Sequence, residues 1–178
     1  MEITERTCNG VTFLAADGMD AAGGAAHGFS TRLGGASEGM WESLNLGVSR
    51  GDDPDHVREN CRRFLKAIGA RGERIAMTNQ VHGGAVRCIT TADVKADPYD
   101  KPGYEADGLM TDLPGVTLMI YTADCIPILF YDPARRVIAA VHAGWRGTAA
   151  GIASQAVERY SALLTASTPE SDLHFPSQ

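Results

Sequence analysis

The chain has 178 residues, of which 44% are hydrophobic and 21% charged, a composition typical of one globular domain with a sizeable core. Its formal net charge of −6 argues against a general affinity for nucleic acids or membrane surfaces and favours small-molecule partners. No stretch approaches the ~20 apolar residues of a membrane span, and the first residues lack a signal-peptide pattern, so we expect a cytoplasmic protein. We expect one domain over residues 1–164 and a polar tail over residues 165–178.

In the first third of the chain, the sequence predicts strands, a loop and a helix with clear start and stop signals. Two short strands and a loop rich in glycine are expected over residues 11–14, 26–30 and 33–39. The helix follows, with Asp53 as N-cap, Pro54 at its first position and Gly69 as its stop. Its apolar residues recur at helical spacing, which predicts one buried face.

Strands dominate the middle of the chain. Four strand-like runs are expected at residues 75–78, 85–89, 108–111 and 116–121. A tight β-hairpin follows, with strands over residues 126–131 and 137–141. Folding this hairpin about Ala134 places residue 125 or 126 opposite His142, and cross-strand neighbours lie only ~5 Å apart. The hairpin therefore predicts that a thiol and an imidazole meet.

Cys125, His142 and His82, which ends another strand-like region, form a candidate set of metal ligands. Three such ligands with one open position are typical of a catalytic zinc site rather than a structural one. A buried free cysteine beside a strand-end histidine has the same spacing, and spacing alone leaves both alternatives open. The other cysteines occur without CxxC pairs, so we expect most of them to be free core thiols.

A strand, a sharp turn and a second helix are predicted after His142. We expect this helix to run from an N-cap at Thr148 to Leu164. Arg146 then lies near the free N–H groups of the helix, where an anion would be favoured. An arginine near a helix start is also common as a plain surface residue.

Seven short motifs follow one another along the chain. They are GFSTRLGG (28–35), SLNLG (43–47), GDDP (51–54), NQVHG (79–83), EADGL (105–109), TADCIP (122–127) and VHAGWRG (141–147). Together they resemble the laccase-domain family, which has been named for polyphenol oxidase, for peptidoglycan editing and for purine nucleoside phosphorylase activity. Members of that family run on beyond the length of this chain, so we expect this chain to lack the usual C-terminal portion.

The resemblance implies an α/β fold, a layered sandwich of mixed β-sheets with outer helices. It also implies that His82, Cys125 and His142 hold a metal ion. Five polar residues become candidates for the pocket: Arg32, Asn45, Asp107, Asp124 and Arg146. Imidazole and thiolate ligands suit zinc and also accept copper.

For function, the resemblance implies purine nucleosides and phosphate as partners. The expected reactions are phosphorolysis of adenosine, inosine or methylthioadenosine, and deamination of adenosine. Zinc can lower the pKa of bound water to ~7, as deamination requires, and Asp124 is the first candidate proton carrier, with Asp107 second. Asn45 is a candidate substrate-binding residue, and phosphorolysis needs an anion site, for which Arg32 and Arg146 are available.

Three alternatives stay open. One is an amide hydrolase that edits peptidoglycan precursors, and another is an inactive remnant of the family. A copper-dependent polyphenol oxidase fits less well, because its multinuclear copper cluster is rich in histidine and this chain has 5 His in all. We also expect an exposed apolar patch on the helix that follows Thr148, which a homodimer would cover.

Overall fold

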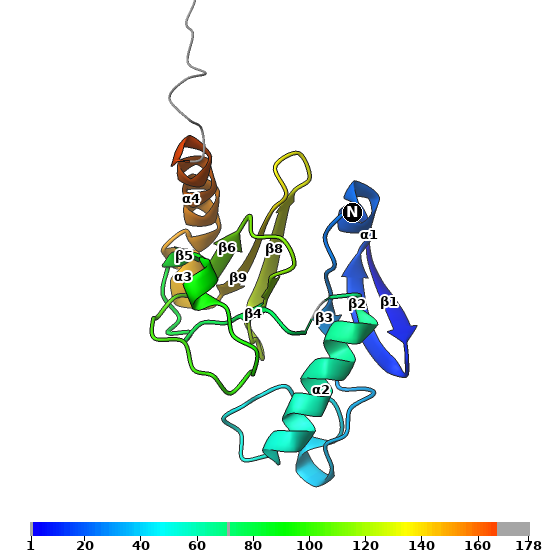
Figure 1. The fold of residues 1–178 in the computed structure, drawn as a ribbon. Coiled ribbons are helices and arrows are strands. Elements are labelled where there is room, and N and C mark those ends of the chain that lie inside the picture. The colour runs from blue at the N-terminus through cyan, green and yellow to red at the C-terminus, as the bar shows by residue number, and fades with distance from the viewer. Residues whose placement is uncertain (1, 71, 167–178) are drawn as a thin grey trace, which may run out of the picture.

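The computed structural model describes residues 2–70 and 72–166, and most of its strands and helices form two groups (Figure 1). The strands are β1 (Ile3–Cys8), β2 (Val11–Ala16), β3 (Phe29–Ser30), β4 (Ile75–Ala76), β5 (Val86–Cys88), β6 (Gly108–Thr111), β7 (Thr117–Leu118), β8 (Ile126–Asp132) and β9 (Val137–Ala143). The α-helices are α1 (Asp17–Ala22), α2 (Pro54–Ala67), α3 (Trp145–Ala149) and α4 (Ile152–Ala166), and the 3₁₀ helices are η1 (Gly39–Trp41) and η2 (Thr91–Asp93).

The first group is an antiparallel sheet, in the order β1-β2-β3, packed against α2. The side chain of Asp53 caps α2 by accepting the N–H of Asp55 at 2.8 Å, as the sequence predicts. The apolar face of α2, including Phe64 and Leu65, packs on the sheet around Phe13. The sequence analysis missed β1 and α1.

The second group is a mixed sheet, in the order β5-β6-β9-β8, in which β5 and β6 run parallel and the other pairs run antiparallel. Helix α4 covers one face of this sheet, where Ile152 and Ala156 are buried with Met110 and Val141. The short parallel pair β4-β7 forms a third, separate sheet. Several sheets with outer helices confirm the expected mixed α/β fold.

Two local predictions are wrong. In the hairpin, His142 lies opposite Pro127 rather than residue 125 or 126, because the turn holds four residues between Asp132 and Val137. The second helix has no N-cap at Thr148, whose N–H donates to the carbonyl of Gly144 within α3. Gly151, at φ 70°, separates α3 from α4, so the expected single helix is two.

The expected apolar patch on the second helix stays a prediction, because the side chains of residues 162–166 lie outside the described part of the chain. The sheet already covers Ile152 and Ala156, and Val157 is the large hydrophobic residue of α4 that stays exposed. Helix α4 extends to Ala166, so the expected start of the tail at residue 165 is two residues too early, and residues 167–178 lie outside the described part of the chain. No helix in the described part is long and apolar enough to cross a membrane.

A buried amide on α2 holds the glycine-rich loop in place. Asn60 is fully buried and accepts the N–H of Ala36 at 2.6 Å. Its amide nitrogen donates to Ser37 Oγ at 2.7 Å and to the carbonyl of Asn45 at 2.8 Å. One side chain therefore satisfies backbone groups at both ends of a loop that has little regular structure.

We predict that Asn60→Ala lowers the free energy of unfolding by about 3 kcal/mol, because it leaves buried backbone groups without partners. Arg62→Ala, on the exposed face of the same helix, is the matched control and should have little effect, because it removes a surface ion pair with Glu59. Urea unfolding followed by circular dichroism measures both. Equal stability of the two variants would refute the anchoring role of Asn60.

Candidate metal centre and its cleft

His82, Cys125 and His142 come from three separate segments and meet at one point. Their ligand atoms all lie within 4.8 Å of one another, and the two imidazole rings meet edge to face with centroids 4.8 Å apart. His142 lies on β9 and is 3% exposed, Cys125 directly precedes β8, and His82 lies in an exposed loop. The structure thus brings together the three residues that the sequence analysis selected as ligands.

A buried carboxylate connects two of these ligands. Asp107, fully buried just before β6, accepts backbone N–H groups from Val81 at 3.2 Å, His82 at 2.9 Å and Gly83 at 2.7 Å. The same carboxylate lies 2.8 Å from Nδ1 of His142. Burial raises the pKa of the Asp107 carboxyl, but the hydrogen bonds from His142 and the three backbone groups outweigh it, so the pKa lies below its ordinary value.

A second connection joins the segments that carry His82 and Cys125. The side-chain amide of Gln80 donates to the carbonyl of Tyr121 and accepts the N–H of Tyr121, both at 2.7 Å. This paired bond fixes the two chain segments side by side, a few residues before each ligand. Local sequence patterns gave no sign of this role for Gln80, because its partner lies 41 residues away.

Gly144 leaves space between the three ligands. A Cβ atom there would lie 3.0 Å from Cδ2 of His82, 3.4 Å from Sγ of Cys125 and 3.6 Å from Cε1 of His142. The backbone of Gly144, at φ −70°, suits any residue, so space rather than conformation requires glycine here. The sequence analysis read this glycine only as part of a turn.

The donor set fits a metal ion. Two imidazoles and a thiolate are ligands that zinc and copper accept, and an open position is typical of a site that binds a substrate or water. The hydrogen bond at Nδ1 of His142 leaves Nε2 free as a ligand atom. Among the other cysteines, Cys61 is buried, and its burial raises the pKa of the thiol to about 11. Cys8 is exposed and Cys88 half-buried, so the expectation that most cysteines are core thiols is wrong.

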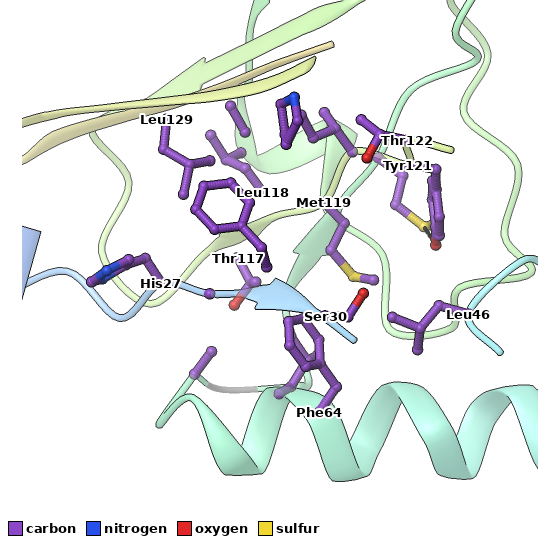
Figure 2. Close-up of a pocket in the computed structure, with 18 of the residues that line it drawn as sticks. His27, Ser30, Leu46, Phe64, Thr117, Leu118, Met119, Tyr121, Thr122 and Leu129 are labelled. Carbon is purple, nitrogen blue, oxygen red and sulfur yellow. Dashed lines mark hydrogen bonds between the residues drawn. The ribbon is translucent and has the colours of Figure 1, made fainter. Parts of the chain in front are cut away.

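The ligands lie at the wall of a large cleft between the two groups of the fold. The cleft has a volume of about 2070 Å³, and His82, Cys125 and His142 are among its lining residues. Figure 2 shows its apolar part, where Leu129 of β8 and Phe64 of α2 point toward each other from opposite sides.

Two predicted substrate-binding residues line this cleft but bind their own loop. Arg32 donates to the carbonyls of Met40, at 2.6 Å, and Glu42. The amide nitrogen of Asn45 donates to the carboxylate of Asp52 at 2.9 Å. These contacts hold the glycine-rich loop closed, and the roles of Arg32 and Asn45 in substrate binding stay predictions.

The other two polar candidates lie at the surface. Asp124 is exposed, lines the cleft and directly precedes the ligand Cys125. Arg146 is exposed on α3, outside the residues that line the cleft, and its guanidinium lies 5.2 Å from the ring centroid of Trp145. The structure therefore keeps Asp124 beside the ligand cluster and does not join Arg146 to the cleft.

The fold and the cluster define a mixed α/β protein with a candidate three-ligand metal site at the wall of a cleft. Residues 26–172 match the model of the family described as multi-copper polyphenol oxidoreductase laccase, and the chain belongs to this family.

Relatives and solved structures agree with this assignment. The chain is 44% identical over 134 residues to a protein named purine nucleoside phosphorylase from Deinococcus radiodurans, covering 75% of this chain and 49% of that protein. It is 40% identical over 132 residues to purine nucleoside phosphorylase YfiH of Escherichia coli, covering 74% and 51%. The crystal structure of YlmD from Geobacillus stearothermophilus superposes with a TM-score of 0.78 at 37% identity, covering 88% of this chain and 58% of that one. The chain thus spans about half the length of the curated relatives it matches.

We predict that Gly144→Ala weakens metal binding by about 10-fold, because its methyl group would enter the space between the three ligands. Gly83→Ala is the matched control: it neighbours His82, but its Cβ would make only ordinary contacts of 3.5 Å or more. Competition with a chromophoric chelator measures the affinity of both variants. Unchanged affinity in Gly144→Ala would show that the ion sits elsewhere.

Proposed function

We propose that this chain carries the metal centre of a cytoplasmic, zinc-dependent purine nucleoside enzyme. The proposed reactions are phosphorolysis of adenosine, inosine and methylthioadenosine, and deamination of adenosine. The observation that carries the proposal is the His82, Cys125 and His142 cluster, with ligand atoms within 4.8 Å at the wall of a cleft. The choice of purines rests on relatives that are named purine nucleoside phosphorylases.

Zinc is the proposed metal because its preferred ligands include both imidazole and thiolate. When bound, it would supply a Lewis acid that makes water reactive near neutral pH, as hydrolytic deamination requires. The residues of the chain place the ligands: β9 positions His142, and the start of β8 positions Cys125. The exposed loop that carries His82 leaves one side of the cluster accessible to a substrate.

Asp124 is the proposed proton carrier for this chemistry. Its carboxylate is exposed to the cleft, where it can exchange protons with water, and it adjoins the ligand Cys125 in sequence. Arg146 lies outside the residues that line the cleft, but it follows the ligand His142 by four residues. It is the proposed phosphate-binding residue because its guanidinium has no carboxylate partner among the ion pairs of the described residues. Arg32 and Asn45 are proposed to shape the far wall of the cleft through the loop that they hold together.

A second candidate function is favoured by the size of the cleft. Its volume of about 2070 Å³ exceeds the ~300–1,000 Å³ that is typical of small-molecule pockets, so a nucleoside would fill only part of it. A longer substrate, such as a peptidoglycan precursor with an amide to be hydrolysed, would use more of this space. The same ligand cluster would serve that reaction.

We predict that the purified protein binds one zinc ion, and that Cys125→Ala and His142→Ala each abolish this binding because they remove a ligand. Cys88→Ala, which changes a half-buried cysteine outside the cluster, is the matched control and should keep full zinc content. Atomic emission spectroscopy on protein purified without chelators measures the zinc. Wild-type zinc content in both ligand variants would refute the site.

The proposed activities predict two separable products from adenosine. Inosine should form without phosphate, whereas adenine should form only when phosphate is present, and chromatography distinguishes the two. Arg146→Ala should reduce adenine formation about 10-fold or more and leave inosine formation close to wild type, because only phosphorolysis needs the anion site. Arg62→Ala is the surface-arginine control.

Two outcomes would contradict this proposal. Equal loss of both products in Arg146→Ala would indicate a damaged pocket rather than a lost phosphate contact. If zinc-loaded protein formed neither product but hydrolysed an amide of a muropeptide, the second candidate function would replace the first.

A further inference from the structure

The carboxylate of Asp107 has no acceptor position left. One oxygen accepts the N–H of His82 and contacts Nδ1 of His142, while the other accepts the N–H groups of Val81 and Gly83. A carboxylate oxygen offers two lone pairs, so four donors fill both oxygens. Asp107 is also fully buried. It therefore cannot carry protons to and from a substrate, which is the second role that the sequence analysis considered for it.

The three backbone N–H groups can only donate, and a carboxylate has no proton of its own, so Nδ1 of His142 is assigned as the donor of its hydrogen bond to Asp107. The neutral ring then bears its proton on Nδ1 and presents the lone pair of Nε2 to the ligand cluster. The opposite tautomer would place a proton on the nitrogen that must bind the metal. The contact thus selects the form of His142 that is competent to be a ligand.

The same carboxylate stabilises an uncommon backbone conformation at the other histidine. His82 has φ 60°, in the left-handed region that residues other than glycine rarely adopt. With the loop in this conformation, the three consecutive N–H groups of Val81, His82 and Gly83 converge on Asp107. These charge-assisted hydrogen bonds offset the cost of the turn.

Asp107 is itself fixed by the sheet. Its N–H donates to the carbonyl of Ala85 at 3.0 Å, and its carbonyl accepts the N–H of His142 at 2.7 Å. It directly precedes β6, which pairs with β9, the strand of His142. One buried side chain therefore joins the loop of His82 to the ring of His142 through a rigid strand pair.

We propose that Asp107 is a positioning residue that prepares the metal site before the ion arrives, by fixing the tautomer of His142 and the loop of His82 together. The inference rests on the proposed metal site and extends it. It assigns Asp107 no contact with substrate and no part in proton transfer.

The test is Asp107→Asn, which keeps the size of the side chain but replaces one acceptor oxygen with an NH₂ donor. If the NH₂ group faces His142, Nδ1 must become an acceptor and the proton moves to Nε2. If it faces the backbone, it opposes the N–H groups of Val81 and Gly83. Either arrangement should weaken zinc binding by roughly 10- to 100-fold.

Two measurements test the inference. Zinc affinity is measured by chelator competition, and the tautomer of His142 is read from long-range ¹H–¹⁵N NMR spectra of metal-free protein. The matched control is Asp93→Asn, because Asp93 is also buried and accepts hydrogen bonds from Arg87 at 2.7 Å and from the N–H of Thr90 at 2.9 Å, outside the ligand cluster. The control should lose stability in urea unfolding and keep its zinc affinity.

Weaker zinc binding in Asp107→Asn with a retained fold, while Asp93→Asn binds as the wild type does, supports the inference. Wild-type zinc affinity in Asp107→Asn overturns it. If Asp107→Asn does not fold, the wild-type protein decides, at a pH high enough for the ring of metal-free His142 to be neutral: the tautomer with its proton on Nδ1 supports the inference, and the tautomer with its proton on Nε2 overturns it. Wild-type protein that binds no zinc would instead refute the proposed function, and the tautomer would still decide the role of Asp107.

Discussion

Four N–H donors converge on one buried carboxylate, and the arrangement of the candidate metal centre depends on this convergence. Asp107 would be costly to bury alone, because an ionised group away from water needs full hydrogen bonding. The loop over residues 81–83 and the ring of His142 provide that bonding. The dependence is mutual, since the hydrogen bonds to the carboxylate stabilise the left-handed turn of the loop at His82. The hydrogen bonding that buried Asp107 requires therefore positions both His82 and His142.

The rest of the fold serves this centre by fixing the strands that lead to it. Hairpin β8-β9 extends from Cys125 and His142 in a continuous ladder, and α4 covers the sheet with Ile152 and Ala156. On the far side of the cleft, α2 and its buried Asn60 hold the glycine-rich loop. The two walls thus differ in character: one wall carries His142 on a regular sheet, with Cys125 at the start of the neighbouring strand and His82 in a loop, while the other wall is a loop fixed by side-chain hydrogen bonds.

Local sequence signals predicted helices and strands well, but they predicted strand register and long-range contacts poorly. Asp53 and Pro54 marked the start of α2, because capping depends on neighbouring residues alone. The pair Asn9-Gly10, with φ values of 50° and 79°, is a strong hairpin signal that was available and was overlooked. The predicted register of the β8-β9 hairpin was wrong, because the register depends on how many residues the turn contains. The role of Asp107 was out of reach, since its partners lie 24 to 35 residues away.

The ligand cluster also differs from a structural zinc site. In a structural zinc site the ion provides folding energy that the chain cannot supply itself. Here each buried side-chain nitrogen or oxygen of the described residues has a hydrogen-bond partner from the protein alone. The ligands His82 and Cys125 keep some exposure, and Gly144 keeps the space between them open. The described residues therefore satisfy their buried polar side chains with protein partners, and the three proposed ligands remain available for an ion that serves chemistry in the cleft.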